Sequence, residues 1–138
     1  MLRLPKTDDT LLLRSDYSDD ARWRELCRLV EAPSADDFRA NLTFVEHPEL
    51  DGKSVAELKA IVEGGGYRSF FFIADHEAIG GREHAVLVVD LADQRGRTFR
   101  VIPTEMWAVE NNLSLANMDF EEFADSVDSE GIFRGFSD

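Results

Sequence analysis

A stripe of polar and aromatic residues lies on one predicted helix in the C-terminal third of the chain. Trp107, Asn111 and Ser114 are spaced i, i+4 and i+7, so a helix that begins near Thr104 places them on one face. An aromatic ring beside amide and hydroxyl groups suits a small polar ligand or the backbone of a partner. Asn has a low helix propensity, so Asn111 and Asn112 in mid-helix go against local preference, as functional positions often do.

Two interpretations of this helix remain open. A small enzyme or ligand-binding domain would use Trp107, Glu110, Asn111 and Asn112, together with an aspartate such as Asp16. The structural alternative is that Trp107 is partly buried and that the amides cap neighbouring loops. A pocket beside the helix would favour the first interpretation, and a flat, packed surface would favour the second.

An acidic segment includes this helix and extends beyond it. Between Val101 and Phe133 there is no Lys or Arg, whereas eight residues are acidic: Glu105, Glu110, Asp119, Glu121, Glu122, Asp125, Asp128 and Glu130. A run of like charge is often only a solvated face. If the face has a role, we expect it to steer and dock a basic partner.

Three aspartates follow predicted strands and raise the question of a magnesium site. Asp16, Asp75 and Asp90 come after three different apolar runs, and ligands often bind outside the carboxyl ends of parallel strands. If the strands that precede Asp75 and Asp90 pair antiparallel, these two aspartates lie at opposite edges. The aspartates would then only close strands and start turns. We predict no metal site here and no cofactor.

Other reactive residues lack the spacing that chemistry requires. Cys27 lies on an apolar helix face, so we expect an inert core thiol. His47, His76 and His84 show no HExxH spacing and have no Cys partner. The triple glycine that starts at Gly64 follows a helix, which favours a C-cap over a phosphate loop. Because no catalytic motif is present, whether the protein is an enzyme stays undecided.

Hydrophobic patterning predicts the elements that position these residues. Apolar runs predict strands over residues 11–14, 42–45, 70–74, 85–89 and 98–102. Helical spacing and capping signals predict helices after Ser18, Ser54, Pro103 and Asp119. The fold class is therefore α+β, or mixed α/β: a sandwich in which about four helices pack on a mixed sheet of about five strands. Crossovers favour parallel pairing early, and short turns favour antiparallel pairing later.

Composition limits the partners. The 138 residues fit one globular domain, which we expect over residues 11–138 after a loose leader at 1–10. The net charge of −13 argues against nucleic acid and against an anionic membrane surface. Residues 1–69 carry 14 acidic and 10 basic residues, whereas residues 70–138 carry 14 and 5, so the excess is C-terminal. One cysteine and no signal peptide or apolar span favour the cytoplasm, and the oligomeric state stays open.

One long block resembles a known family. The run RTFRVIPTEMWAVENNLSLANMDF at residues 97–120, with residues 14–20 and 131–136, is similar to an uncharacterised family of small acidic bacterial proteins classed as a domain of unknown function. This resemblance implies a stand-alone domain and no assigned activity.

The sequence favours a small non-enzymatic binding or regulatory domain, of the immunity or inhibitor type. We expect it to present its acidic C-terminal helical face to a basic protein. The candidate contact residues are Trp107, Glu110, Asn111, Asn112, Ser114, Asp119, Glu121, Glu122 and Asp16. The alternative is a small-ligand-binding domain or small enzyme with a pocket beside the helix of Trp107 and Asn112.

Overall fold

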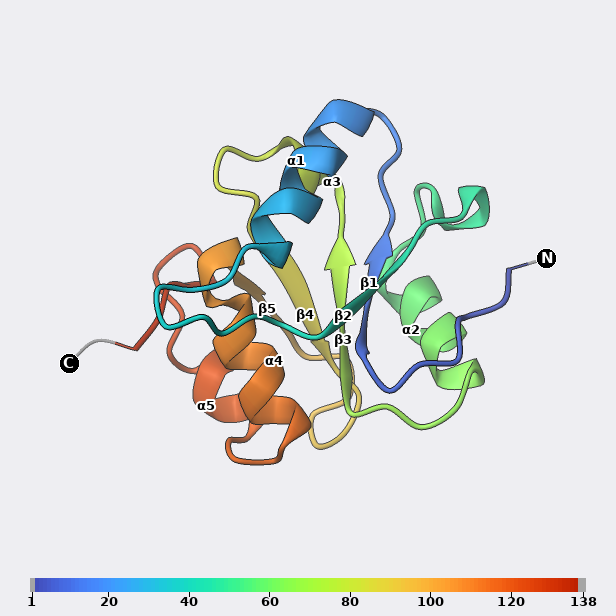
Figure 1. The fold of residues 1–138 in the computed structure, drawn as a ribbon. Helices are drawn as coiled ribbons and strands as arrows, with labels where there is room; N and C mark the ends of the chain where they lie inside the picture. The colour runs from blue at the N-terminus through green and yellow to red at the C-terminus, as the bar shows by residue number, and fades with distance from the viewer. Residues whose placement is uncertain (1, 137–138) are drawn as a thin grey trace.

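A computed structural model describes residues 2–136 as a six-stranded mixed sheet with helices on both faces. Its strands, shown in Figure 1, are β1 (Thr10–Arg14), β2 (Leu42–Val45), β3 (Phe70–Ala74), β4 (Val86–Asp90), β5 (Thr98–Val101) and β6 (Ile132–Phe133). They lie in the order β2-β1-β3-β4-β5-β6. Strand β1 pairs in parallel with β2 and β3, β4 is antiparallel to β3 and β5, and β6 is parallel to β5.

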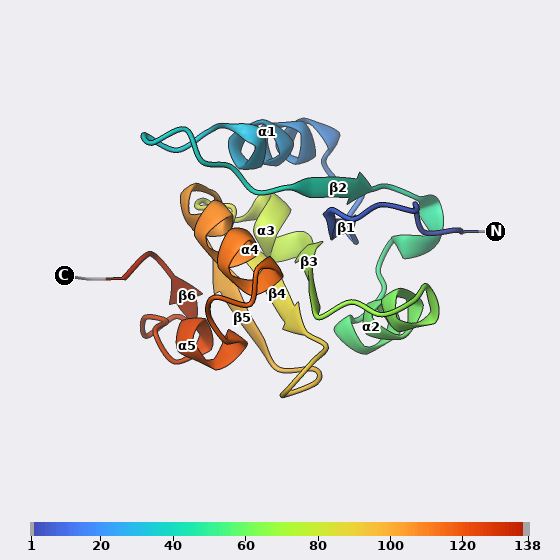
Figure 2. The same cartoon turned by 60° about the horizontal axis from the view of Figure 1, so that its bottom comes forward.

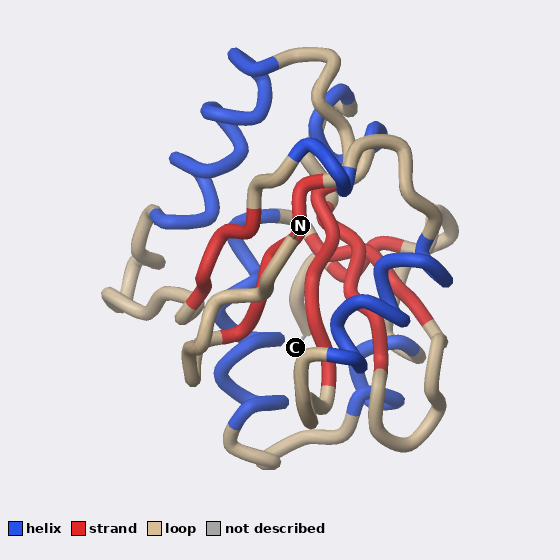
Figure 3. Tube along the Cα trace, turned by 90° about the vertical axis from the view of Figure 1, so that its right-hand side faces the viewer, coloured by secondary structure: helices blue, strands red, loops and turns tan. Residues whose placement is uncertain are grey.

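Within the described residues, five α-helices complete the fold: α1 (Asp20–Glu31), α2 (Val55–Gly64), α3 (His76–Gly80), α4 (Met106–Ser114) and α5 (Phe120–Ala124). Figure 3 shows helices on both sides of the strands. The α+β class and the mixed pairing are therefore confirmed, with six strands in place of about five and five helices in place of about four. No helix among residues 2–136 is both long and apolar enough to cross a bilayer.

Successive side chains on the central strands point to opposite faces of the sheet, so the protein has two separate hydrophobic cores. In β3, Phe70 and Phe72 face the first core, whereas Phe71 and Ile73 face the second. Helices α1, α3, α4 and α5 contribute to the first core and α2 to the second. Figure 2 shows α1 and α2 far apart, with β1 and β2 between them. Because both faces are covered, β3 and β4 are buried along their whole length, which explains their continuous apolar sequences.

Local signals set most helix ends. The predicted capping boxes are present at Ser54 with Glu57 and at Asp119 with Glu122. The N-cap of α1 is Asp19 and not Ser18, because the Asp19 carboxylate accepts the Arg22 amide at 3.0 Å. A 3₁₀ turn, Pro103–Glu105, precedes α4, so that helix begins at Met106, two residues later than predicted.

Two short elements were not predicted. Helix α3 has five residues and β6 has two, so neither is long enough to show a hydrophobic period. The segment before β1 forms no helix or strand over residues 2–9, yet Leu2 and Leu4 pack against the second core.

Candidate interaction surface

Glu110 fastens α4 to the amino ends of β1 and β2. Only 2% of the surface of Glu110 is exposed to solvent. One carboxylate oxygen accepts the Asn41 amide at 2.7 Å and the Asn111 side chain at 3.1 Å. The other accepts the Thr10 hydroxyl at 3.2 Å and the Ser114 hydroxyl. Since a carboxylate has about four acceptor positions, Glu110 is fully occupied by its own chain.

The remaining members of the predicted stripe also contact the chain itself. Trp107 stacks on Phe38, with ring centroids 5.0 Å apart, and Phe38 is 49% exposed. Asn111 donates to the Arg39 carbonyl at 3.2 Å, and Asn112 donates to the Ala108 carbonyl at 2.8 Å. Trp107 and Asn111 therefore hold the loop of residues 33–41 against α4. Of the stripe, only Ser114 lines a pocket in the part of the chain that the structure describes, an open one shared with Thr10 and Arg68.

The part of the acidic segment that follows α4 forms α5 and the turn after it. Helix α5 buries Phe120 and Phe123 and exposes Glu121 and Glu122. Two of the acids are paired, Asp125 with Arg97 at 2.7 Å and Asp128 with Arg134 at 2.7 Å. Asp119 and Glu122 cap the helix that they begin. Within residues 2–136, the exposed carboxylates of Glu121 and Glu130 have no ion-pair or hydrogen-bond partner.

Two arginines of the C-terminal half pair wholly outside the acidic segment, and a third pairs with it only in part. Arg95 pairs with Glu63, Arg100 with Asp75 and Glu77, and Arg134 with Glu83 as well as Asp128. These pairs leave few positive charges to neutralise the acidic segment. Its negative potential is thus available to a partner.

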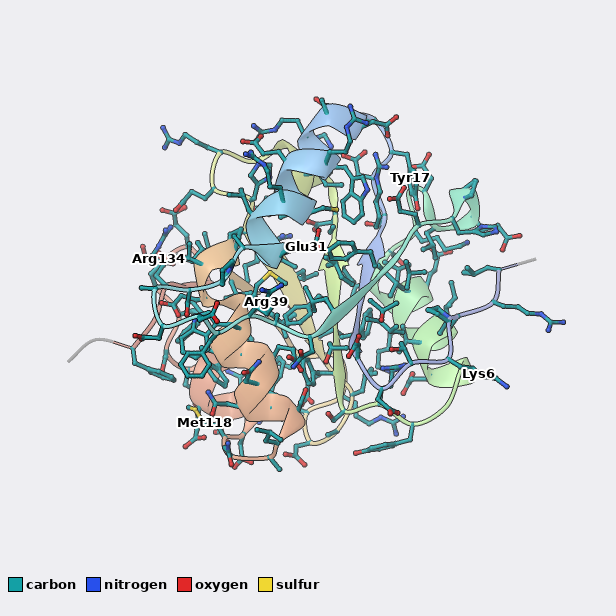
Figure 4. All side chains as sticks on the ribbon, in the orientation of Figure 1. Lys6, Tyr17, Glu31, Arg39, Met118 and Arg134 are labelled. Carbon is teal, nitrogen blue, oxygen red and sulfur yellow. The ribbon has the colours of Figure 1, made fainter. Side chains whose placement is uncertain are left out.

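A cavity of about 140 Å³ lies between the start of β3, the β4–β5 turn and the α4–α5 connection. Phe70, Leu113, Met118 and Phe120 give it an apolar lining, and Figure 4 shows Met118 at the lower left of the molecule. Asp90, Asp93 and Asp119 also line it. This cavity lies beside the C-terminal end of α4, and the predicted stripe contributes no residue from Trp107 to Asn112.

Asp90 differs from the other two acids because it is buried, with only 2% of the residue exposed. One of its oxygens accepts the Ala92 amide at 3.0 Å and the other accepts the Gln94 amide at 2.7 Å. No cationic side chain among residues 2–136 pairs with it. Two of its four acceptor positions are therefore unfilled beside the cavity, in contrast to Glu110.

Asp16 lies at the opposite end of the sheet from this cavity, after β1. Figure 4 shows its neighbour Tyr17 at the upper right, far from Met118. Asp16 accepts the Ser18 hydroxyl at 3.1 Å and approaches His76 Nδ1 at 3.2 Å. Burial raises the pKa of Asp16, but bonds from Ser18 and His76 outweigh it and hold that pKa below its usual value. Because the carboxylate stands between Ser18 and His76, the histidine does not activate the serine.

The three strand-end aspartates do not converge. Strands β3 and β4 are antiparallel, so Asp75 and Asp90 lie at opposite edges. Asp75 caps α3 and pairs with Arg100 at 2.6 Å. In the described part of the chain, no three His, Cys, Asp or Glu side chains are placed to hold a metal ion.

Cys27 is half-buried and His84 is buried. Burial, followed by the charges of Glu46 and Glu31, raises the pKa of the Cys27 thiol to about 12. His84 is buried, and its Nδ1 lies 2.8 Å from the Ala78 carbonyl. Its Nε2 lies 3.4 Å from Glu25 without hydrogen-bond geometry. A thiol with a raised pKa is a poor nucleophile at neutral pH.

Sequence reasoning missed two features. Arg14 is buried at the end of β1, with its guanidinium 4.3 Å from the Tyr17 ring centroid and 2.7 Å from Asp20. A charged residue that ends an otherwise apolar strand was the available signal. Asp93 was missed because an aspartate in a polar turn is ordinary, and only the fold brings it beside Phe70 and Leu113.

Comparison with known proteins gives a family and no activity. Residues 9–136 match the family model described as Domain of unknown function (DUF6924). No curated protein matches the chain.

Proposed function

The chain belongs to the DUF6924 family, whose description names no activity, and we propose that it is a non-enzymatic interaction domain that binds a basic protein. Its contact surface is the acidic segment of α5 and the following turn. The proposal includes an inhibitor-like or immunity-like role in the bacterial cytoplasm. The single half-buried Cys27 is compatible with such a reducing compartment.

The observation that supports the proposal most directly is the uncompensated charge of this segment. Glu121 and Glu130 are exposed and have no partner within residues 2–136. The nearby bases Arg97 and Arg134 already pair with Asp125 and Asp128. An unneutralised acidic surface raises the association rate with a basic partner and disfavours acidic ones.

The alternative, a small ligand held beside Trp107 and Asn112, has less support. The Glu110 carboxylate, the Ser114 hydroxyl and the side-chain nitrogens of Asn111 and Asn112 are engaged within the chain. A ligand on this stripe would have to displace those contacts, at the full cost of leaving buried polar groups unpaired.

The test begins with partner capture on the immobilised protein at low and at high salt, followed by identification and purification of the captured protein. Its dissociation constant is then measured for the wild type, for Glu121→Gln/Glu130→Gln and for Glu31→Gln/Asp36→Asn. Both double variants remove two negative charges, but the second pair lies on and after α1. We expect the first variant to weaken binding about tenfold at low salt and the second to leave it within about twofold.

Two results would contradict the proposed function. One is a specific partner whose affinity does not change between low and high salt, since screening must weaken contacts between exposed charges. The other is an equal loss of affinity in both double variants, which would mean that only net charge matters.

A further inference from the structure

We propose that the cavity between the β4–β5 turn and the α4–α5 connection receives a lysine side chain of the partner protein. This inference rests on the proposed function and names the anchoring contact within it. The cavity is distinct from the exposed carboxylates of Glu121 and Glu130, which do not line it.

The lining of the cavity matches the stem of a lysine. Phe70, Leu113, Met118 and Phe120 supply apolar surface, and the volume of about 140 Å³ is too small for a large ligand. Lysine buries its four methylene groups against apolar surface while its ammonium seeks polar partners. Of these four lining residues, only Phe120 lies on α5. A lysine stem in the cavity would therefore contact α5 through the Phe120 ring.

The charge of the cavity matches the ammonium group. Asp90, Asp93 and Asp119 line it, and no Lys or Arg side chain does. Asp90 is the decisive residue, because it is buried, has no cationic partner among residues 2–136 and keeps two acceptor positions unfilled. A buried carboxylate without a counter-charge is costly, and an incoming cation would lower that cost.

The geometry favours lysine over arginine and over a metal ion. Each Asp90 oxygen already accepts one turn amide and keeps about one open position, and the small volume of the cavity favours a compact ammonium over a planar guanidinium. An ammonium is a compact charge that needs only one open acceptor position. A metal ion would need three converging ligands, and no such group occurs in the described residues.

The direct test uses Nα-acetyl-lysine N-methylamide as the probe, followed through the backbone amide resonances of the ¹⁵N-labelled protein. We expect saturable shifts at Asp93 and Met118 and none at Ser18 and His76, which lie at the other end of the sheet. The Nε-acetylated form of the same probe keeps the stem and loses the charge. It should bind on the order of tenfold more weakly, and the arginine counterpart should also bind more weakly than lysine.

Variants of the protein separate charge from folding. Asp93→Asn/Asp119→Asn removes two carboxylates from the cavity, and Asn at position 119 still caps α5. We expect this variant to weaken lysine binding about fivefold. Glu31→Gln/Asp36→Asn is the matched control and should bind the probe like the wild type. Thermal unfolding of each variant verifies that the fold is retained.

The outcomes separate this inference from the proposed function. Equal binding of the charged and acetylated probes, tighter binding of the arginine probe, or an absence of saturable shifts would overturn the lysine site. The salt-dependent partner binding through Glu121 and Glu130 would stand in each of those cases. Conversely, the probe could bind at Asp93 while the affinity for the partner protein stays the same at low and high salt. That result would support the lysine site and refute the electrostatic function.

Discussion

At the scale of single residues, two buried carboxylates have opposite roles. Glu110 is surrounded by four donors from three segments of the chain, so its charge stabilises the packing of α4. Asp90 has only two turn amides and lies beside a cavity, so its charge is incompletely satisfied. Burial alone therefore does not identify a functional acid, whereas the count of filled acceptor positions separates the two.

Replacement of Glu110 tests its structural role. Glu110→Ala leaves the Asn41 amide and two hydroxyls without their acceptor and opens space under α4. We expect a loss of about 3 kcal/mol in the free energy of unfolding, measured by urea denaturation. Glu110→Gln keeps one acceptor oxygen and should lose about 1 kcal/mol. Similar losses for both variants would show that the charge itself, and not the hydrogen bonds, stabilises this junction.

At the scale of elements, α3 is held by a contact that its sequence does not encode. The helix has five residues, too few to be stable alone, and is capped by Asp75. Arg100 on β5 donates to both Asp75 oxygens, at 3.0 and 2.6 Å, and pairs with Glu77 at 3.0 Å. A two-pronged contact with the cap residue fixes α3 against β5.

Arg100→Lys tests this contact, because lysine keeps the charge but loses the planar fork. We expect the free energy of unfolding to fall by about 1–2 kcal/mol, and the amide of Ala78 to exchange faster with solvent. Arg97→Lys is the matched control, since Arg97 pairs with the exposed Asp125. Its effect should stay below about 0.5 kcal/mol. If the two variants were equally stable, the Asp75 contact would not matter for α3.

At the scale of the whole molecule, paired carboxylates and net charge have opposite effects on the free energy of unfolding at neutral pH. Bonds from Arg134 hold the pKa of Glu83 and Asp128 below their ordinary values, and Lys59 and Arg95 do the same for Glu63. These pairs stabilise the fold above the ordinary carboxylate pKa near 4, and that stability is lost as the pH falls through the lowered values. The net charge of −13, in contrast, repels itself at neutral pH.

The balance of these effects predicts an optimum of stability near pH 5. Between about pH 7 and pH 5, partial protonation of unpaired acids relieves repulsion, so the urea midpoint should rise slightly. Below about pH 4 the paired carboxylates become protonated and the midpoint should fall. Arg134→Gln removes the partner of Glu83 and Asp128, so its acid-side decline should be shallower. A midpoint that rises steadily down to pH 3 would refute this account.

Local patterning was sufficient for the long elements but not for the short ones. The five predicted strands became β1 to β5 with shifts of one residue at most, because the runs of β3 and β4 are continuously apolar and turn residues separate the mixed run of β5 from β4. The boxes at Ser54 and Asp119 were predictable because capping depends on residues three apart. Strand β6 was not, since its two residues are a strand only by virtue of pairing with Arg100 and Val101.

The candidate surface was predictable in charge and not in arrangement. The acid excess and the helical spacing of Trp107, Asn111 and Ser114 can be counted along the chain. The contact between α4 and the loop of residues 33–41 depends on the Asn41 amide and on Phe38. Both lie about 70 positions before α4 in sequence. Asp16 was grouped with the stripe as a candidate, and the fold puts it at the other end of the sheet.

The sequence by itself determined the fold class, the capping boxes at Ser54 and Asp119 and the position of the negative charge, because each depends on neighbours within about one turn or one strand. Only the tertiary structure decided which acids are satisfied. It gave Glu110 two distant donors, Thr10 and Asn41, besides the two on its own helix, because those segments meet α4 only when the sheet has formed. Asp90 has only the two amides of its own turn and lies beside a cavity that distant segments enclose. Hydrogen-bond satisfaction is a property of packing between distant segments, so it cannot be derived from local pattern.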